Sequence, residues 1–561
     1  MPELVVRNPV AEPSAQRHPL APRAGHLDGL RLGLWWNKKV GGQVALEWFA
    51  KELAERSGVT AERFYGRYPA LPSFIKQCAA ASDIVIGSTG DCGSCTSTLI
   101  HDLIEIELTG VPTAGLVASS FIDDARETAR VFGMPNLRLV EIPGPLTNLT
   151  RAEVEQVAAN VFDDVLAALV RSDTEPAEPA SQLPSHLPSR HRYPGADYLD
   201  AIRSFQADFV ARGIGDGFWL VPPTDEAVAE MLTGTGRDAD EVIAIMAPGR
   251  GLATVEMIAV NAVMAGCAPQ HLPVLLAAVD AMAQPEFTLR QVAMSTGPHT
   301  PFVVVNGPIA ERIGMNSGRG ALGPGRPSAV NSVIGRAVRL IMMNVGYAYV
   351  GIFDLDTIGT PRKYSMAVAE NESASPWAPL HVSRGLRAGE SAVTVFSVES
   401  ALEIQDMDND DAPRLLRTFA RSIGMPGSSS VQHTYLEPTG GGYELHNLMV
   451  VCPDHAAVLG KAGWTREQVI GFVYEESKRP KADVLNAVHP DAMRPSQRWA
   501  ADVPDGTLLP VMAGPEALHL IVLGGATGKS QYHTGIGEPS TRSVEPFLPE
   551  RLRAAGASVT P

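Results

Sequence analysis

Short apolar runs alternate with amphipathic segments through the first third of the chain. The apolar runs have the length of buried strands and cover residues 29–36, 83–87, 112–118 and 137–142. In the segments beside them, apolar residues recur as on one face of a helix, over residues 43–56, 73–81, 98–108, 123–132 and 150–171. The last segment opens with Thr150-Arg-Ala-Glu153, which is typical of a capping box. Strands and helices that alternate in this way predict an α/β fold, with a doubly wound parallel sheet covered on both faces.

Composition divides the remainder of the chain. The 561 residues are enough for two or three domains. Residues 1–28 contain several Pro breaks and predict a flexible arm, and residues 173–193, rich in Pro, Ser and charge, predict a linker. We therefore expect an N-terminal α/β domain over residues 29–172. A larger C-terminal α/β or α+β region of one or two domains should follow over residues 194–545, with a tail at 546–561.

Glycine-rich loops follow predicted strands in the C-terminal region. Arg250 lies in the loop after the strand at 241–246, and Arg319 and Arg326 lie in the loops between the strand at 300–306 and a helix from 329 to about 343. Backbone N–H groups at a helix start, together with an arginine guanidinium group, form an anion-binding site. The alternative is that Gly and Arg only shape the turns. Lys529 ends a Gly-rich loop after a strand near 518–523. The first glycine of an ATP-binding loop is missing there, because Leu523 occupies its position, so substrate binding is the better interpretation.

A run of polar residues between 354 and 381 offers acid–base groups or metal ligands. Two alternate carboxylates, Asp354 and Asp356, point to the same side of a strand and suit one shared divalent cation. Glu370, Glu372 and His381 complete the candidate set. The alternative is a solvated loop that is held by salt bridges.

Charge and cysteine content exclude several classes of function. The net charge of −16 disfavours a nucleic-acid or anionic-membrane partner, and no apolar run is long enough to span a bilayer. Five cysteines, an odd number in a long chain, argue against a disulfide framework and for a reducing cytoplasm. We expect a homo-oligomer without a membrane or nucleic-acid partner.

The candidate chemistry centres on Gly-Asp-Cys-Gly-Ser-Cys-Thr, residues 90–96, between a predicted strand and a predicted helix. Backbone N–H groups at such a junction stabilise a thiolate, so Cys92 becomes a nucleophile and Cys95 its partner. The neighbouring Asp91 would tune the thiol or orient a substrate, although its charge opposes thiolate formation. Half of a zinc site, or two inert buried thiols, are the alternatives.

Other polar residues fall at strand ends on the same edge of the predicted sheet. Asn37 and Lys38 follow the first strand, and Thr96 lies in the first turn after the cysteines. Because the carboxyl ends of parallel strands meet at one edge, these residues can converge on Cys92. Lys38 could equally be a solvated loop charge.

The same residues resemble a known family. Gly-Asp-Cys-Gly-Ser-Cys-Thr-Ser, the following His101-Asp102 and Glu107-Leu-Thr-Gly-Val-Pro112, and Trp35-Trp36-Asn37-Lys38 resemble the UGSC family, which is named for a Sec-Gly-Ser-Cys motif. The resemblance covers about residues 28–172, and this chain has cysteine, Cys92, at the selenocysteine position. It adds His101 to the catalytic candidates. More distantly, the chain is similar to the selenoprotein B subunits of glycine and proline reductases, which cleave a carbon–nitrogen bond reductively.

Three functions are compatible with these observations. The first is a thiol-dependent oxidoreductase that acts on a small anionic metabolite through the Cys pair and a thiol or protein electron donor, with no further cofactor unless a divalent metal is present. The second is a carbon–sulfur lyase or sulfur-transfer enzyme with a persulfide on Cys92. The third is a metal-binding or non-catalytic subunit. In the first of these, the C-terminal region would bind the anionic small molecule and close over the cysteines.

Overall fold

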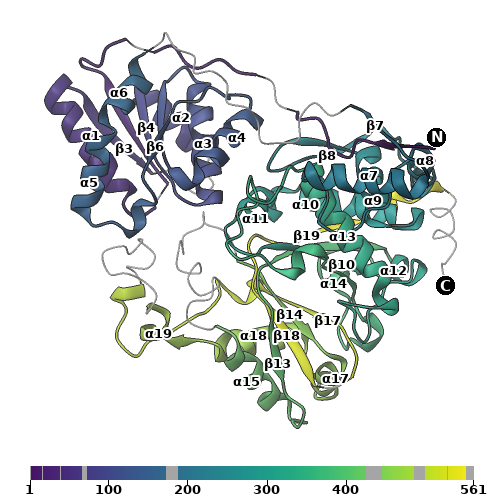
Figure 1. The fold of residues 1–561 in the computed structure, drawn as a ribbon. Coiled ribbons are helices and arrows are strands. Elements are labelled where there is room, and N and C mark those ends of the chain that lie inside the picture. The colour runs from purple at the N-terminus through teal and green to yellow at the C-terminus, as the bar shows by residue number, and fades with distance from the viewer. Residues whose placement is uncertain are drawn as a thin grey trace.

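The N-terminal domain is a parallel five-stranded sheet between two layers of helices (Figure 1). The computed structural model describes residues 2–14, 17–23, 25–37, 39–65, 72–171, 188–424, 445–485, 500–526 and 528–550. The strands are β2 (Arg31–Trp36), β3 (Thr60–Tyr65), β4 (Ile84–Gly90), β5 (Thr113–Ala118) and β6 (Leu139–Ile142). Their order across the sheet is β3-β2-β4-β5-β6, and each neighbouring pair is parallel. The predicted doubly wound α/β fold is confirmed.

Alternation along the strands builds one core on each face of this sheet. Leu32, Leu34, Ile84 and Ile86 pack with helices α1 (Gly42–Ser57), α5 (Arg151–Asn160) and α6 (Phe162–Val170). Trp35, Val85 and Val117 face the other layer, α2 (Pro72–Ala81), α3 (Gly93–Glu107) and α4 (Ile122–Val131). The capping box at Thr150 and Glu153 is present. The long helix expected over 150–171 is divided into α5 and α6 at Val161.

The chain reverses its winding between β2 and β4. From β2 it moves outward to β3, returns past β2 to β4, and continues through β5 to β6. Helices α1 and α3 therefore leave neighbouring strands on opposite faces of the sheet. The gap between the carboxyl ends of β2 and β4 is the topological switch point, where ligands bind in sheets of this kind.

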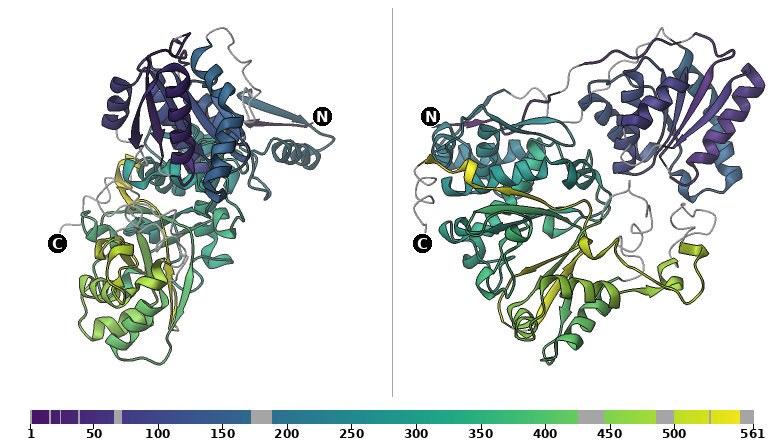
Figure 2. Two further views of the ribbon diagram at one scale, coloured as in Figure 1. Left: turned by 90° about the vertical axis from the view of Figure 1, so that its left-hand side faces the viewer. Right: turned by 180° about the vertical axis from the view of Figure 1, so that it is seen from behind.

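The C-terminal region contains two mixed four-stranded sheets (Figure 2). The first has the order β11-β10-β12-β19, with β10 (Thr300–Asn306), β11 (Ala367–Ala369), β12 (Ala392–Val398) and β19 (Ser540–Ser543). The second has the order β13-β18-β14-β17, with β13 (Leu402–Gln405), β14 (Asn447–Val451), β17 (Leu518–Val522) and β18 (Lys529–His533). Side chains of both sheets, among them Phe302, Phe396 and Val450, share one core cluster, so the two sheets pack on each other.

Helices cover each of these sheets. The first packs with a mostly helical core built from α7 (Tyr198–Ala211), α8 (Asp225–Leu232), α9 (Val255–Ala265), α10 (Leu272–Met282), α11 (Leu289–Met294), α12 (Pro308–Arg312) and α13 (Ala329–Asn344). The second is covered by α15 (Ala412–Ser422), α17 (Pro453–Lys461) and α18 (Arg466–Glu476). Shorter elements are the β8 (Val242–Met246) and β9 (Gly251–Thr254) ribbon, α14 (Leu380–Ser383), and α19 (Lys481–Leu485) beside β15 (Arg479–Pro480) and β16 (Leu508–Leu509). Within the described residues no helix has the length and apolar character that crossing a membrane requires.

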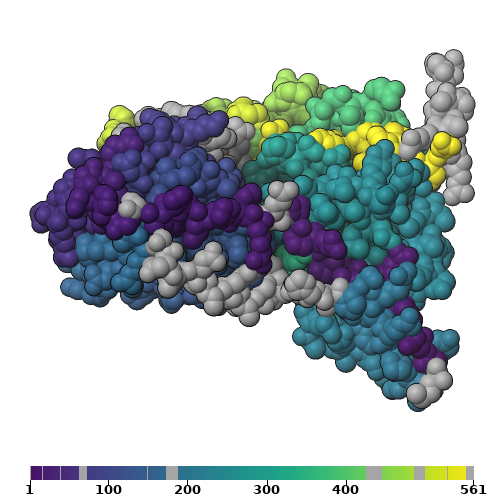
Figure 3. Space-filling model, turned by 90° about the horizontal axis from the view of Figure 1, so that it is seen from above, coloured from purple at the N-terminus to yellow at the C-terminus, as the bar shows by residue number. Residues whose placement is uncertain are grey.

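The predicted arm and the described end of the predicted linker pair with each other, which corrects both expectations. β1 (Glu3–Arg7) forms an antiparallel ladder with β7 (Arg190–Pro194). Leu4 and Val6 are buried in the C-terminal core, because the alternation in Glu-Leu-Val-Val-Arg gives the strand one apolar face. From there the chain runs along the C-terminal region to the N-terminal domain (Figure 3), and the Nδ2 of Asn261 donates to Pro9 O at 3.1 Å.

Candidate functional site

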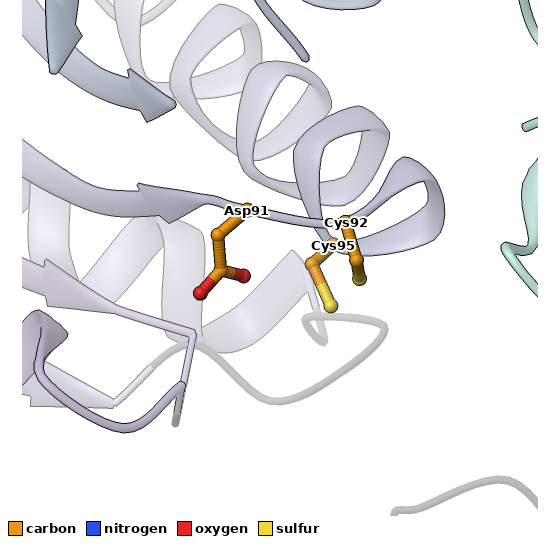
Figure 4. A group of neighbouring side chains, drawn as sticks. All are labelled: Asp91, Cys92 and Cys95. Atoms are coloured by element: carbon orange, nitrogen blue, oxygen red, sulfur yellow. The ribbon is translucent and has the colours of Figure 1, made fainter. Parts of the chain in front are cut away.

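Cys92 and Cys95 lie at the topological switch point, where β4 ends and α3 begins. Cys92 is the N-cap residue of α3, in extended conformation, and Cys95 is three residues further along in the first turn. Both side chains are partly buried and reduced. Figure 4 shows the two sulfur atoms side by side, with the Asp91 carboxylate turned to the same space. The side chains that the sequence placed near one another at this loop are therefore neighbours.

The two thiols differ in acidity. A hydrogen bond from the Cys95 side chain lowers the pKa of Cys92 to about 6, helped by the charge of Lys39 and the backbone N–H of Cys95, and opposed by burial and by Asp91. The same contact with Cys92, together with burial, raises the pKa of the Cys95 thiol well above its ordinary value. At neutral pH, Cys92 is therefore mostly thiolate, and Cys95 is its protonated partner. The largest cause is the second thiol rather than the helix start that the sequence suggested.

Asp91 is buried between a lysine and a threonine. Its Oδ1 lies 3.5 Å from the Nζ of Lys39, and its Oδ2 accepts a hydrogen bond of 3.0 Å from Thr147 Oγ1. Lys39 follows β2 and Thr147 follows β6, so the carboxylate links loops from distant strands. The lysine charge beside Asp91 offsets the penalty that the carboxylate imposes on the Cys92 thiolate.

Asn37 joins the ends of β2 and β4. Its Nδ2 donates to Thr89 O at 2.7 Å, and its Oδ1 accepts from the backbone N–H of Thr89 at 3.2 Å. Because both ends of the amide are bonded to the backbone of Thr89, Asn37 holds the ends of the two strands together, and its contact with a substrate stays a prediction. Lys38 lies outside the described residues, and its neighbour Lys39 is the cation beside the cysteines.

Thr96 and His101, the remaining candidates on α3, have different surroundings. Thr96 is fully buried against Gly90, and its Oγ1 has no hydrogen-bond partner. His101 lies more than one turn beyond the cysteines, with its ring against Phe132 and its Nδ1 3.6 Å from Asp102. Thr96 thus stays near the site, whereas His101 belongs to the surface that faces the C-terminal region.

Asp124 is a site residue that sequence reasoning missed. It lies in the first turn of α4, which follows β5, and both of its carboxyl oxygens are buried without a hydrogen-bond partner. Burial raises the pKa of Asp124 well above its ordinary value, and the charge of the Cys92 thiolate raises it further. In sequence, Asp123-Asp124 is indistinguishable from a solvated pair of acids at a helix start.

The C-terminal region covers the beginning of α3. A Cβ on Gly93 would overlap the backbone oxygen of Met294 in α11 and would lie 3.0 Å from Leu355 Cδ1. Farther along the same contact, the guanidinium groups of Arg250 and Arg290 lie 5.5 Å and 5.9 Å from the Phe132 ring. Arg250 therefore reaches the N-terminal domain, but at the His101 end of this contact rather than at the cysteines.

The other predicted anion-binding residues lie away from the cysteines. Arg319 and Arg326 are exposed, and Arg319 packs against Gly525 in the Gly-rich loop before β18. The Nζ of Lys529 lies 3.2 Å from Glu403 Oε1 on the neighbouring strand β13. A strand follows this loop where an ATP-binding loop would have a helix. The structure does not unite these residues in one anion site.

The predicted metal set is split into two places. Asp354 and Asp356 share Lys363, at 2.7 Å and 2.9 Å, and Asp354 also meets Arg339 at 2.9 Å. Glu370 and Glu372 both accept hydrogen bonds from Asn306 beyond the carboxyl end of β10, and His381 is buried nearby. Cations of the protein already neutralise the first pair, so the salt-bridged alternative describes Asp354 and Asp356, and the five residues do not form one metal site.

One group in the described part of the chain has ligand atoms close enough to share a metal ion. A carboxylate oxygen of Asp91 and the sulfur atoms of Cys92 and Cys95 all lie within 4.8 Å of one another. Two thiolates and a carboxylate suit a soft divalent cation such as zinc, for which a fourth ligand would be needed. The same three groups serve thiol chemistry without an ion.

Fold and site together define a doubly wound α/β domain with a polarised thiol pair at its switch point. Residues 5–171 match the model of the UGSC family, and the match begins inside β1 rather than near residue 28. The match ends before the C-terminal region. Neither the search of curated proteins nor the search of solved structures gave a match.

Proposed function

We propose that the protein is an enzyme in which Cys92 attacks an electrophilic atom of a small polar substrate. The observation that supports this most directly is the division between the two sulfur atoms, because Cys92 has a pKa of about 6 while Cys95 retains its proton. A thiolate at neutral pH beside a neutral thiol is the arrangement of a nucleophile and its resolving partner. The net reaction would be a reductive cleavage or a thiol–disulfide exchange.

In the first step the Cys92 thiolate forms a bond to the substrate. In a redox cycle, Cys95 then attacks the Cys92 sulfur, and the bond from that sulfur to the substrate breaks. The departing substrate atom takes the electron pair and the Cys95 proton, which leaves a Cys92–Cys95 disulfide and releases the reduced substrate. An external thiol or a protein dithiol would restore the pair. The covering of α3 by α11 and Leu355 supports a site that is shielded from water by the C-terminal region.

The test is alkylation of reduced protein with iodoacetamide across pH 4 to 10, with the modified cysteines identified by mass spectrometry. We expect the Cys92 peptide to be labelled with a midpoint near pH 6 and Cys95 to react only at high pH. A Cys92→Ser variant should lose all turnover with any substrate that co-purifies with or thermally stabilises the protein. An ordinary thiol midpoint for Cys92, or full turnover by the variant, would overturn the proposal.

A metal-binding role is the second candidate, and the 4.8 Å grouping of Asp91, Cys92 and Cys95 favours it. Elemental analysis of protein purified without chelator separates the two. Stoichiometric zinc that protects both cysteines from iodoacetamide supports the metal role, whereas metal-free protein with a reactive Cys92 supports the enzyme. An added sulfur atom on Cys92 after incubation with sulfur donors would indicate transfer instead of reduction.

A further inference from the structure

Asp124 is a buried carboxyl group without a hydrogen-bond partner among the residues that the structure describes. Its residue is only 5% exposed, and neither oxygen accepts or donates a hydrogen bond. One turn further along α4, the Oγ1 of Thr128 is also buried and also lacks a hydrogen-bond partner among the described residues. A buried polar group without a hydrogen bond costs about 1–3 kcal/mol, so two in consecutive turns mark a place where a ligand or water completes the structure.

The position of Asp124 is on the Cys92 side of the domain. β5 is the neighbour of β4 in the sheet, and α4 packs on α3, so the first turns of both helices lie at the same edge. Beside burial, the charges of the Cys92 thiolate and of Glu127 raise the pKa of the Asp124 carboxyl. Burial raises the pKa of this carboxyl, whereas the hydrogen bond from Cys95 lowers the pKa of Cys92, so the two pKa values shift toward each other.

The C-terminal region limits the access of water to this place. Gly93 and His101 lie on one face of α3, at either end of two helical turns, and Ser97 lies between them. Gly93 contacts Met294 O, and His101 contacts Phe132, which lies under Arg250. Ser97, whose buried Oγ has no hydrogen-bond partner among the described residues, therefore lies on the face of α3 that is turned toward the C-terminal region.

We propose that Asp124 is the proton donor of the Cys92 site and that the substrates are carbon electrophiles whose leaving group departs as an amine or an alkoxide. This rests on the proposed role of Cys92 as nucleophile. The thiolate forms a sulfur–carbon bond, the bond from carbon to the leaving group breaks, and its electron pair takes the Asp124 proton. The products are a thioether on Cys92, the neutral amine or alcohol, and the Asp124 carboxylate. A poor leaving group needs this proton, whereas iodide does not.

Two probes with different leaving groups test the assignment on the full-length protein. Iodoacetamide expels iodide, and the epoxide glycidol opens to an alkoxide that requires a proton. We expect Asp124→Asn to leave the rate of Cys92 alkylation by iodoacetamide within about twofold and to slow the glycidol reaction by at least about tenfold. Asp123→Asn, in the same turn but exposed and paired with Arg126, is the matched control and should change neither rate.

The wild-type protein gives an independent readout if the variant folds poorly. The glycidol rate should rise as Cys92 ionises and fall again at higher pH as Asp124 loses its proton, while the iodoacetamide rate stays on a plateau. Equal effects of Asp124→Asn on both probes, no effect on either, or a glycidol profile without the alkaline fall would overturn the role of Asp124. Loss of the Cys92 midpoint near pH 6 would instead contradict the proposed function itself.

Discussion

Within the thiol pair, position and not residue type decides which sulfur ionises. Cys92 caps α3 and receives a hydrogen bond from the Cys95 side chain, so its charge is stabilised by a group that is itself made less acidic. Lys39 contributes from the end of β2, and Asp91 opposes it. Because the lysine charge also lies beside Asp91, removing it should expose the thiolate to the full repulsion of the carboxylate.

We therefore predict that Lys39→Met raises the pKa of Cys92 and slows its alkylation at pH 6 several-fold, with little change at pH 9, where the thiolate forms in both proteins. The measurement is the pH profile of iodoacetamide labelling. Lys51→Met, which removes an exposed charge on the far part of α1, is the control and should leave the profile unchanged. An identical profile for Lys39→Met and wild type would contradict this account of the site.

The sequence locates the cysteines well and their surroundings poorly. Cys92 and Cys95 are predictable because a glycine-flanked cysteine pair between an apolar run and an amphipathic segment has few structural interpretations. Lys38 lies outside the described residues, and the contribution of Lys39 depends on the course of a loop, which periodicity does not predict. The raised pKa of Asp124 depends on burial by elements that are distant in the chain, and no local sequence pattern predicts such burial.

At the scale of elements, the first turn of α3 is where the two parts of the chain meet most closely. Gly93 lies directly after the N-cap, and the backbone oxygen of Met294 occupies the space of its missing side chain. A glycine here permits α11 to approach the cysteines. The flanking glycine of the motif thus has a packing role in addition to its place in the turn.

We predict that Gly93→Ala destabilises the protein by about 1–3 kcal/mol, because its Cβ would overlap a backbone atom that cannot rotate away. Denaturant unfolding measures the loss, and faster labelling of Cys92 would show that α11 has moved from α3. Gly471→Ala on α18 is the control. No atom lies within 4 Å of its added Cβ, and a helical alanine in place of glycine should stabilise by about 0.5–1 kcal/mol. Equal stability of Gly93→Ala and wild type would show that the contact is loose.

Elements with a clear period were predictable, and those set by tertiary pairing were not. The strand at 300–306 and the helix beginning at 329 agree with β10 and α13, because their apolar patterns are continuous. β3 lies at the edge of its sheet, and its sequence Thr-Ala-Glu-Arg-Phe-Tyr lacks a continuous apolar run. β1 is formed by pairing with residues more than 180 positions away, which a local reading of Pro breaks cannot reveal.

At the scale of the whole molecule, buried neutral histidines make the C-terminal region sensitive to acid. His271 is 4% exposed and accepts a hydrogen bond from Ala268 N at its Nδ1, and burial lowers its pKa to about 4. Burial also lowers the pKa of His533 to about 4. The unfolded chain has histidines of pKa about 6.5. Between these values the unfolded state binds more protons than the folded state, so stability falls as the pH drops from about 6.5 toward 4.

This difference predicts that lowering the pH from 7 to 4.5 reduces the free energy of unfolding by about 2–3 kcal/mol for each such histidine. His271→Gln keeps an acceptor near the Ala268 N–H but cannot titrate, so its unfolding free energy should fall less over the same range, even if it is lower at pH 7. Denaturant titrations at pH 7, 5.5 and 4.5 measure the slopes. His18→Gln, at a partly exposed histidine of the N-terminal segment, is the control for replacing a histidine with glutamine. Parallel curves for His271→Gln and wild type would mean that His271 protonates at its ordinary pKa in the folded protein, and the acid sensitivity would then have to arise at other groups of the C-terminal region.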